Sequence, residues 1–188
     1  MKEIELEFSQ REILNKGAVK TLRREGKIPC VVYSKGIANR HGYVDTVAIK
    51  MLLQKMEQGF LPSTRFVLKD SSGKTCKAIV KEIQYFPTTY EVCHIDFLEL
   101  VPERYVELKV PVQFTGAAEC VGVKAGGFLR QLRRHVPVRC LPQDIPSHFT
   151  IDVKDLEMFK SRVVNDIAMP KGITPRVKGN DVVVSVVK

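Results

Sequence analysis

Apolar and polar residues alternate over short stretches of the chain, which is the pattern of half-buried β-strands. Residues 4–8, IELEF, are the first example, with Ile4, Leu6 and Phe8 on one side and two glutamates on the other. The same pattern, or a short apolar run, predicts strands at 30–34, 43–49 and 90–100, and two strands within 65–86 that turn at the Ser-Ser-Gly of 71–73.

Two short helices are expected among these strands. In residues 15–29, NKGAVKTLRREGKIP, the apolar Ala18, Val19 and Leu22 fall on one side at about 100° per residue. Gly26 and Pro29 then supply a stop signal. A second helix is expected at 50–59, KMLLQKMEQG.

The pattern changes near residue 101, after which short strands are separated by Pro and Gly. These strands are expected within 105–116, 132–142, 148–153 and 180–188. We therefore predict a mainly β protein with short helices, of the α+β class, in two domains: residues 1–100 and a second β-rich domain, residues 101–188.

The net charge is +9 and the isoelectric point is about 9.4, values that favour a polyanionic partner. Nucleic acid and acidic membranes are the usual candidates. No apolar run approaches the roughly 20 residues that a membrane-spanning helix needs. The first residues, MKEIELEF, do not form a signal-peptide core. We expect a cytoplasmic protein that binds nucleic acid rather than a membrane.

The basic residues are most concentrated in the first expected helix. Residues 16–27 contain five basic residues, Lys16, Lys20, Arg23, Arg24 and Lys27, against one acid, Glu25. On a helix, Lys20, Arg23 and Arg24 project opposite Ala18 and Leu22, so the basic face would point outward. This arrangement favours a phosphate-binding helix, with an ordinary solvated face as the alternative.

A second basic cluster occurs in the β-rich domain. It comprises Arg130, Arg133, Arg134 and Arg139, with His135 among them. Because the spacing defines no single face, a second RNA contact is only one interpretation, and a loop or strand end is the other.

His94 and Asp96 share one face of the strand expected at 90–100, opposite Cys93, Ile95 and Phe97. Their donors and acceptors suit the ribose hydroxyls and base edges of the RNA minor groove. Ordinary polar exposure is the main alternative. A metal site lacks further ligands at suitable spacing, because the other histidines are isolated. A Cys-His nucleophile is disfavoured because Cys93 and His94 point to opposite faces.

The five cysteines are scattered and odd in number, and no two form a CxxC pair. We interpret them as free thiols packed as small hydrophobic residues rather than as a disulfide framework or zinc site. A thiol hydrolase that uses one of them with a histidine is the enzymatic alternative, although no catalytic signature supports it.

Four segments, in order and with matching spacing, resemble one family: the bacterial large-subunit ribosomal protein numbered twenty-five, in its two-domain CTC or general-stress type. The segments are NKGAVKTLRREGKIPCVVYSKG, VKEIQYFPTTYEVCHIDFLEL, GVKAGGFLRQLRRHVPVRCLPQDIP and SRVVNDIAMPKGI. Val19, Thr21 and Ser34 depart from the residues usual in the family, which puts one phosphate or ribose contact and the shape of the loop after Tyr33 in doubt.

This resemblance implies an N-terminal closed β-barrel that binds 5S rRNA, followed by the second β-rich domain. It implies a structural constituent of the large ribosomal subunit, without enzymatic activity, cofactor or metal. The RNA-binding residues would be Arg11, Lys16, Lys20, Arg23, Tyr33, Lys81, Gln84, His94 and Asp96, to which the charge pattern adds Arg24. The second domain is expected to contact neighbouring ribosomal proteins. The alternative is a stress-related RNA-binding protein of the same fold that acts away from the ribosome.

Overall fold

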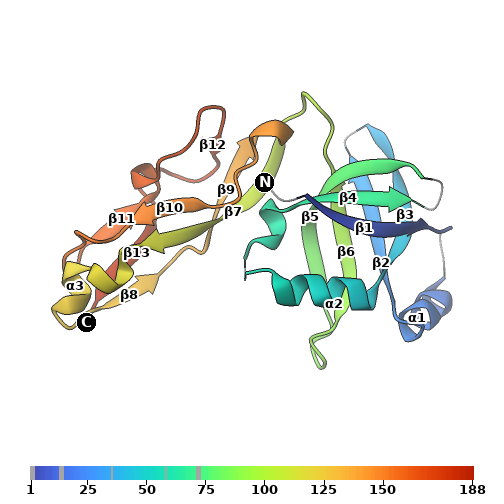
Figure 1. The fold of residues 1–188 in the computed structure, drawn as a ribbon, viewed down its shortest axis with the longest axis horizontal. Helices are drawn as coiled ribbons and strands as arrows, with labels where there is room; N and C mark the ends of the chain where they lie inside the picture. Colours follow the sequence, from blue (N-terminus) through green and yellow to red (C-terminus); the bar gives the residue numbers. More distant parts are fainter. Residues whose placement is uncertain (1–2, 13–14, 35, 58, 71–72) are drawn as a thin grey trace. The chain divides into compact units, whose positions relative to one another are not determined.

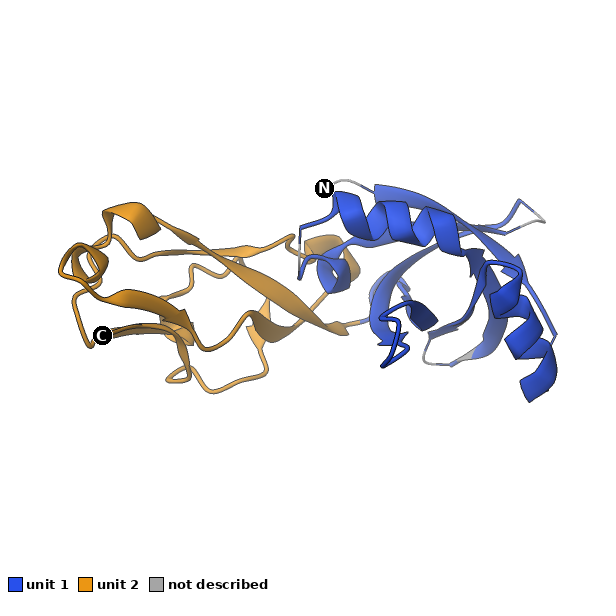
Figure 2. Ribbon diagram, turned by 90° about the horizontal axis from the view of Figure 1, so that it is seen from below, with its two compact units in different colours: residues 1–104 blue, residues 105–188 orange. Residues whose placement is uncertain are grey.

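The computed structural model describes residues 3–12, 15–34, 36–57, 59–70 and 73–188. It divides the chain into two compact units, residues 1–104 and residues 105–188 (Figure 2). Both units are built mainly from β-strands with short helices, which confirms the predicted fold class. Residues 101–104, which the strand pattern grouped with the second half, belong to the first unit.

The first unit is a closed six-stranded barrel with the strand order β1-β3-β2-β6-β5-β4 (Figure 1). The strands are β1 (Glu3–Gln10), β2 (Lys27–Ser34), β3 (Ile37–Asp45), β4 (Arg65–Asp70), β5 (Thr75–Tyr85) and β6 (Val92–Glu99). Parallel pairing of β1 with β4 closes the barrel, and β2 pairs with β6 in parallel; the other neighbouring strands are antiparallel. A closed barrel has no unpaired edge strand.

The barrel interior is filled by side chains from alternate positions of every strand. Leu6 and Phe8 of β1 face inward as predicted, and Phe66 meets Phe97 edge to face at 6.0 Å between ring centroids. The thiol of Cys30 lies among them and is fully buried. Since successive residues of a strand point to opposite faces, the inward set also fixes which side chains face outward.

Two helices pack on the barrel: α1 (Lys16–Arg24) and α2 (Thr46–Lys55), with a 3-10 turn at η1 (Leu61–Ser63). The predicted strand at 43–49 is wrong in its second half, because residues 46–49 begin α2. The reason is local: the Asp45 carboxylate accepts a hydrogen bond from the Val47 N–H at 3.3 Å and caps the helix. The strand instead extends backward to Ile37. Ser71 and Ser72 of the predicted turn lie outside the described residues.

The second unit contains two sheets. One has the order β10-β7-β9-β12, from β7 (Val106–Thr115), β9 (His135–Cys140), β10 (Phe149–Asp152) and β12 (Thr174–Pro175). The other has the order β11-β13-β8, from β8 (Phe128–Gln131), β11 (Ser161–Val163) and β13 (Val182–Val187). The short helical elements are α3 (Val121–Lys124), η2 (Ala117–Glu119), η3 (Pro142–Asp144) and η4 (Val164–Asp166).

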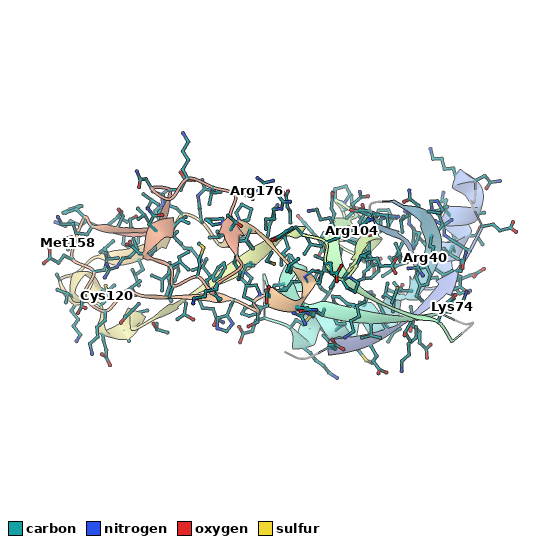
Figure 3. All side chains as sticks on the ribbon, turned by 90° about the horizontal axis from the view of Figure 1, so that it is seen from above. Arg40, Lys74, Arg104, Cys120, Met158 and Arg176 are labelled. Carbon is teal, nitrogen blue, oxygen red and sulfur yellow. The ribbon has the colours of Figure 1, made fainter. Side chains whose placement is uncertain are left out.

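Buried valines and isoleucines from both sheets form the interior of the second unit. Cys120, labelled in Figure 3, is buried beside them, and its thiol donates a hydrogen bond to the Leu156 carbonyl at 3.2 Å. Cys140 of β9 is also fully buried. These positions agree with the interpretation of the cysteines as small core residues.

Gly42 of β3 is required where β1 closes against β3. A Cβ at this position would lie 2.6 Å from the Ser9 carbonyl oxygen and would overlap the Phe8 ring. Gly42→Ala should therefore destabilise the protein by about 1–3 kcal/mol, which is the usual cost of overpacking a core. Denaturant unfolding of the variant and the parent would measure this difference.

Gly17→Ala is the matched control for that substitution. Its Cβ would meet only the Asn15 Oδ1 atom, at an ordinary 3.5 Å, and the position lies in α1, where alanine is favoured over glycine. We expect this control to unfold at the same or a slightly higher denaturant concentration. Equal stability of the Gly42 variant would contradict the close packing of β1 on β3.

Candidate RNA interface

The outer face of β6 carries the histidine and the aspartate that the sequence singled out. Ile95 and Phe97 face the barrel interior, so His94 and Asp96 face outward. The His94 Nδ1 and Asp96 Oδ1 atoms are 2.7 Å apart, and both side chains are partly buried. In the neutral imidazole, this bond selects the tautomer in which Nδ1 carries the proton, and Nε2 is then an acceptor.

Neighbouring strands extend this face. On β5, Glu82 is in register with Asp96, and Gln84 is in register with His94. Strands in register lie about 4.8 Å apart, so the side chains of each pair are neighbours. A β-bulge interrupts the β5–β6 register between Val80 and Glu82, and exposed Lys81 lies within it.

Tyr33 of β2 adds a phenol to the same outer surface. It follows the inward-facing Val32 and is half-buried. Burial raises the pKa of Tyr33, and the negative charges of Asp96 and Glu82 raise it further. The hydroxyl therefore stays neutral and can donate a hydrogen bond. We refer to Tyr33, Glu82, Gln84, His94 and Asp96 together as the polar barrel face.

The sequence around the helix α1 carries signals that define both of its ends. The Asn15 side chain accepts a hydrogen bond from the Ala18 N–H at 2.9 Å, which caps the start. Gly26 follows its end with φ of 76°, in the left-handed region that glycine tolerates. Arg23 and Arg24 lie in the last turn, where positive charge complements the helix dipole.

The exposed basic residues of α1 are Lys16, Lys20 and Arg24, which we call the α1 basic face. Glu25, the one acid within residues 16–27, is paired with Lys27 at 3.0 Å, and this hydrogen bond raises the pKa of Lys27. Among the residues that the structure describes, the α1 basic face makes no ion pair. Its charge is available to an external anion.

Arg23 does not point outward with the α1 basic face, contrary to the helical projection. Its Nε donates a hydrogen bond to the Cys93 carbonyl at 3.1 Å, and its guanidinium lies 5.5 Å from the centre of the Phe86 ring. A long arginine side chain can turn back along apolar surface, which a projection of backbone angles cannot show. Arg23 thus ties α1 to β6 beside His94.

Arg11 lies at the other border of the same outer surface. Its backbone N–H donates to the His41 carbonyl at 2.9 Å, and its Nε donates to the Gly42 carbonyl at 3.0 Å. His41 is in register with Val31, which is in register with Asp96, so the His41 side chain faces outward too. No local pattern in the sequence selects His41, because only strand pairing brings it near β6.

The second basic cluster, in the second unit, does not form one face. Arg133 pairs with Asp181 at 2.8 Å, and the Arg139 guanidinium lies over the Tyr105 ring at 4.8 Å from its centre. Arg130 belongs to β8 and Arg139 to β9, which are strands of different sheets. The cluster is therefore divided between sheets, and Arg133 and Arg139 already have partners.

Other kinds of site receive little support from the described residues. Within the described ranges, no group of three or more His, Cys, Asp or Glu side chains could hold a metal ion. None of the helices in the described part of the chain is long and apolar enough to cross a membrane. The predicted opposite facing of Cys93 and His94 is not confirmed, because the β5–β6 register shifts between Gln84 and Tyr85 and leaves Cys93 as an extra residue of β6.

Comparison with known proteins identifies the family. The model of the Ribosomal L25p family matches residues 6–97, and that of the C-terminal domain of ribosomal protein TL5 matches residues 105–188. A relative from Chlamydia abortus, named large ribosomal subunit protein bL25, is 41% identical over 97% of this chain and 98% of its own length. The chain belongs to the ribosomal L25p family.

Other relatives agree with this membership. Proteins of the same name from Chlamydia pneumoniae and Chlamydia muridarum are 43% and 40% identical, over 90% and 98% of this chain and 91% and 100% of their own lengths. The L25p family is one of ribosomal proteins rather than enzymes, which sets aside the thiol-hydrolase alternative. The barrel is thus the L25p part of the chain.

The environment of Cys30 predicts an unreactive thiol. Burial raises the pKa of Cys30 to about 12, so only about one molecule in ten thousand carries the thiolate at pH 8. We expect iodoacetamide at this pH to leave Cys30 unmodified in the folded protein and to modify it in guanidinium chloride, as peptide mass spectrometry would show. Modification at equal rates in both conditions would contradict the buried, structural role.

Proposed function

We propose that this chain, a structural constituent of the large ribosomal subunit, binds 5S rRNA through the barrel unit. The family supports the first part of this statement. The second part is supported by one observation above all: the Arg23 bond to the Cys93 carbonyl joins the α1 basic face to the polar barrel face. Positive charge for phosphates and hydrogen-bonding groups for riboses and bases are thereby held on one surface.

The α1 basic face would bind phosphates. Lys16, Lys20 and Arg24 are exposed on a capped helix, so they can neutralise phosphates and release condensed counterions. Arg11 and Lys81 would make further backbone contacts at the borders of the site. Such contacts position the RNA and supply much of the affinity, although they do not read its sequence.

The polar barrel face would contact the minor groove. In A-form RNA this groove is wide and shallow and displays ribose hydroxyls and base edges. His94 presents an acceptor at Nε2, Tyr33 presents a hydroxyl donor, and Gln84 offers both donors and an acceptor. Because Asp96 fixes the His94 ring, that side chain loses little conformational entropy when RNA binds.

The protein would act in the cytoplasm as part of the ribosome, in agreement with its relatives. The second unit would contact neighbouring ribosomal proteins. Fractionation of cells grown with and without stress would separate this role from the alternative, an RNA-binding protein that acts away from the ribosome. Substantial free protein outside the subunit and polysome fractions would favour that alternative.

A substitution in either part of the proposed site should weaken the binding of RNA. We expect Arg23→Ala and His94→Ala each to lower the affinity for purified 5S rRNA by about 1–3 kcal/mol, because each removes a direct contact or its support. Filter binding or anisotropy at fixed salt would measure this. Lys109→Ala, an exposed charge on β7 of the second unit, is the control and should bind like the parent. Parent-like affinity of both barrel variants would exclude this site.

The salt dependence provides a separate test of the phosphate contacts. Across about 50–200 mM salt, the affinity should fall steeply as the salt concentration rises. In Lys20→Ala, the slope of log affinity against log salt concentration should be smaller by the amount expected for about one lost phosphate contact. A tRNA competitor should displace little 5S rRNA. Equal, weak binding of both RNAs would mean that the fold is present without the specific site.

A further inference from the structure

The hairpin between β5 and β6 carries aromatic side chains that the proposed site does not include. Tyr85, Phe86 and Tyr90 are 46%, 37% and 79% exposed. The Phe86 N–H donates to the Glu91 carbonyl at 2.8 Å, and the Tyr90 N–H donates to the Phe86 carbonyl at 2.9 Å, so the hairpin is closed and ordered. It projects from the ends of β5 and β6 (Figure 1). Grouped exposed aromatic residues mark an interaction site.

The backbone at Tyr90 gives a second indication. Its φ is 55°, in the left-handed region where bulky side chains carry a steric cost. Glycine or asparagine would adopt this conformation more easily, so the backbone alone does not explain a tyrosine there. Strain of this kind is concentrated at functional positions.

The hairpin is also fixed beside the polar barrel face, and its charge suits RNA. Arg23 lies against the Phe86 ring, and Lys50 of α2 pairs with Glu91 at 2.9 Å. The segment 85–90, YFPTTY, contains no acidic residue, and the charge of Glu91 is already compensated. A polyanion on the α1 basic face would therefore meet no strong repulsion from this hairpin.

We propose that Tyr90 stacks on an unpaired base of the RNA that binds the barrel. The proposal rests on the proposed function and extends it from the phosphates and minor groove to a single-stranded position of the RNA. An exposed, rigidly presented ring is suited to this because every base has a π-face, and stacking does not depend on phosphate charge. Phe86, held by Arg23, would support the hairpin rather than stack itself.

The absence of tryptophan from the chain permits a direct test. In Tyr90→Trp, titration with 5S rRNA should produce a saturable fall in tryptophan emission, since a stacked base quenches indole. Tyr105→Trp, at an exposed tyrosine of the second unit, is the matched control and should show no comparable fall.

Affinities provide the second readout. Tyr90→Ala should bind 5S rRNA about 5- to 100-fold more weakly than the parent, without a change in the salt slope, whereas Tyr90→Phe should bind like the parent. Tyr90→Gly should lose affinity in the same way while melting at the same or a higher temperature. The Gly variant thus separates loss of the ring from loss of the fold.

Three results would overturn the inference. Unchanged emission in Tyr90→Trp, together with weakened binding by Arg23→Ala, would reject the stacking contact and leave the proposed function intact. A parent protein that does not bind 5S rRNA would reject both. Unchanged 5S affinity of Tyr90→Ala, with depletion of the variant from assembled large subunits, would assign the hairpin to a protein neighbour instead.

Discussion

Closure of the barrel by the parallel pairing of β1 with β4 is the constraint on which the first unit depends. It joins the first strand of the chain to a strand some sixty residues later, with Leu6 opposite Leu68 in register. Closure fixes which side chains of each strand point into the barrel. A one-residue shift in the register of β1 or β4 would turn the buried Phe8 or Leu68 outward. The same alternation determines that His94 and Asp96 point to solvent. The position of the candidate site is therefore a consequence of how the core is packed.

A second constraint is the attachment of α1, a helix with no fully buried residue. A nine-residue helix is marginal by itself in water, so its position depends on contacts with the barrel. The bond from Arg23 to the Cys93 carbonyl and its contact with Phe86 supply part of that attachment. Arg23 consequently acts through geometry as well as charge, and a lysine could not reproduce the planar contact on the ring. The proposed hairpin contact depends on the same residue.

Much of this arrangement follows from local sequence patterns, but not all of it. Alternation identified β1 and β6, and with them the outward His94 and Asp96, because the period of a strand is a local property. The helix α1 was predictable from Ala18, Leu22 and Gly26 for the same reason. The family resemblance, rather than periodicity, supplied the closed barrel and residues such as Arg11. The outward position of His41 and the inward turn of Arg23 depend on strand pairing and side-chain packing, which join residues distant in sequence.

The distribution of ion pairs explains how a barrel with a small net charge can present a basic surface. Residues 1–100 carry 16 Lys and Arg against 12 Asp and Glu, so the excess is only +4. Several acids of the barrel are paired: Glu3 with Lys77, Glu5 with Lys69, Glu91 with Lys50, and Glu99 with Arg40, which Figure 3 labels. The three Glu–Lys pairs are exposed and add little to stability, whereas the Arg40–Glu99 pair is partly buried. Their effect on the field is larger, because they neutralise basic residues outside α1. The exposed Lys16, Lys20 and Arg24 take part in none of these pairs, so their positive charge remains for an approaching anion.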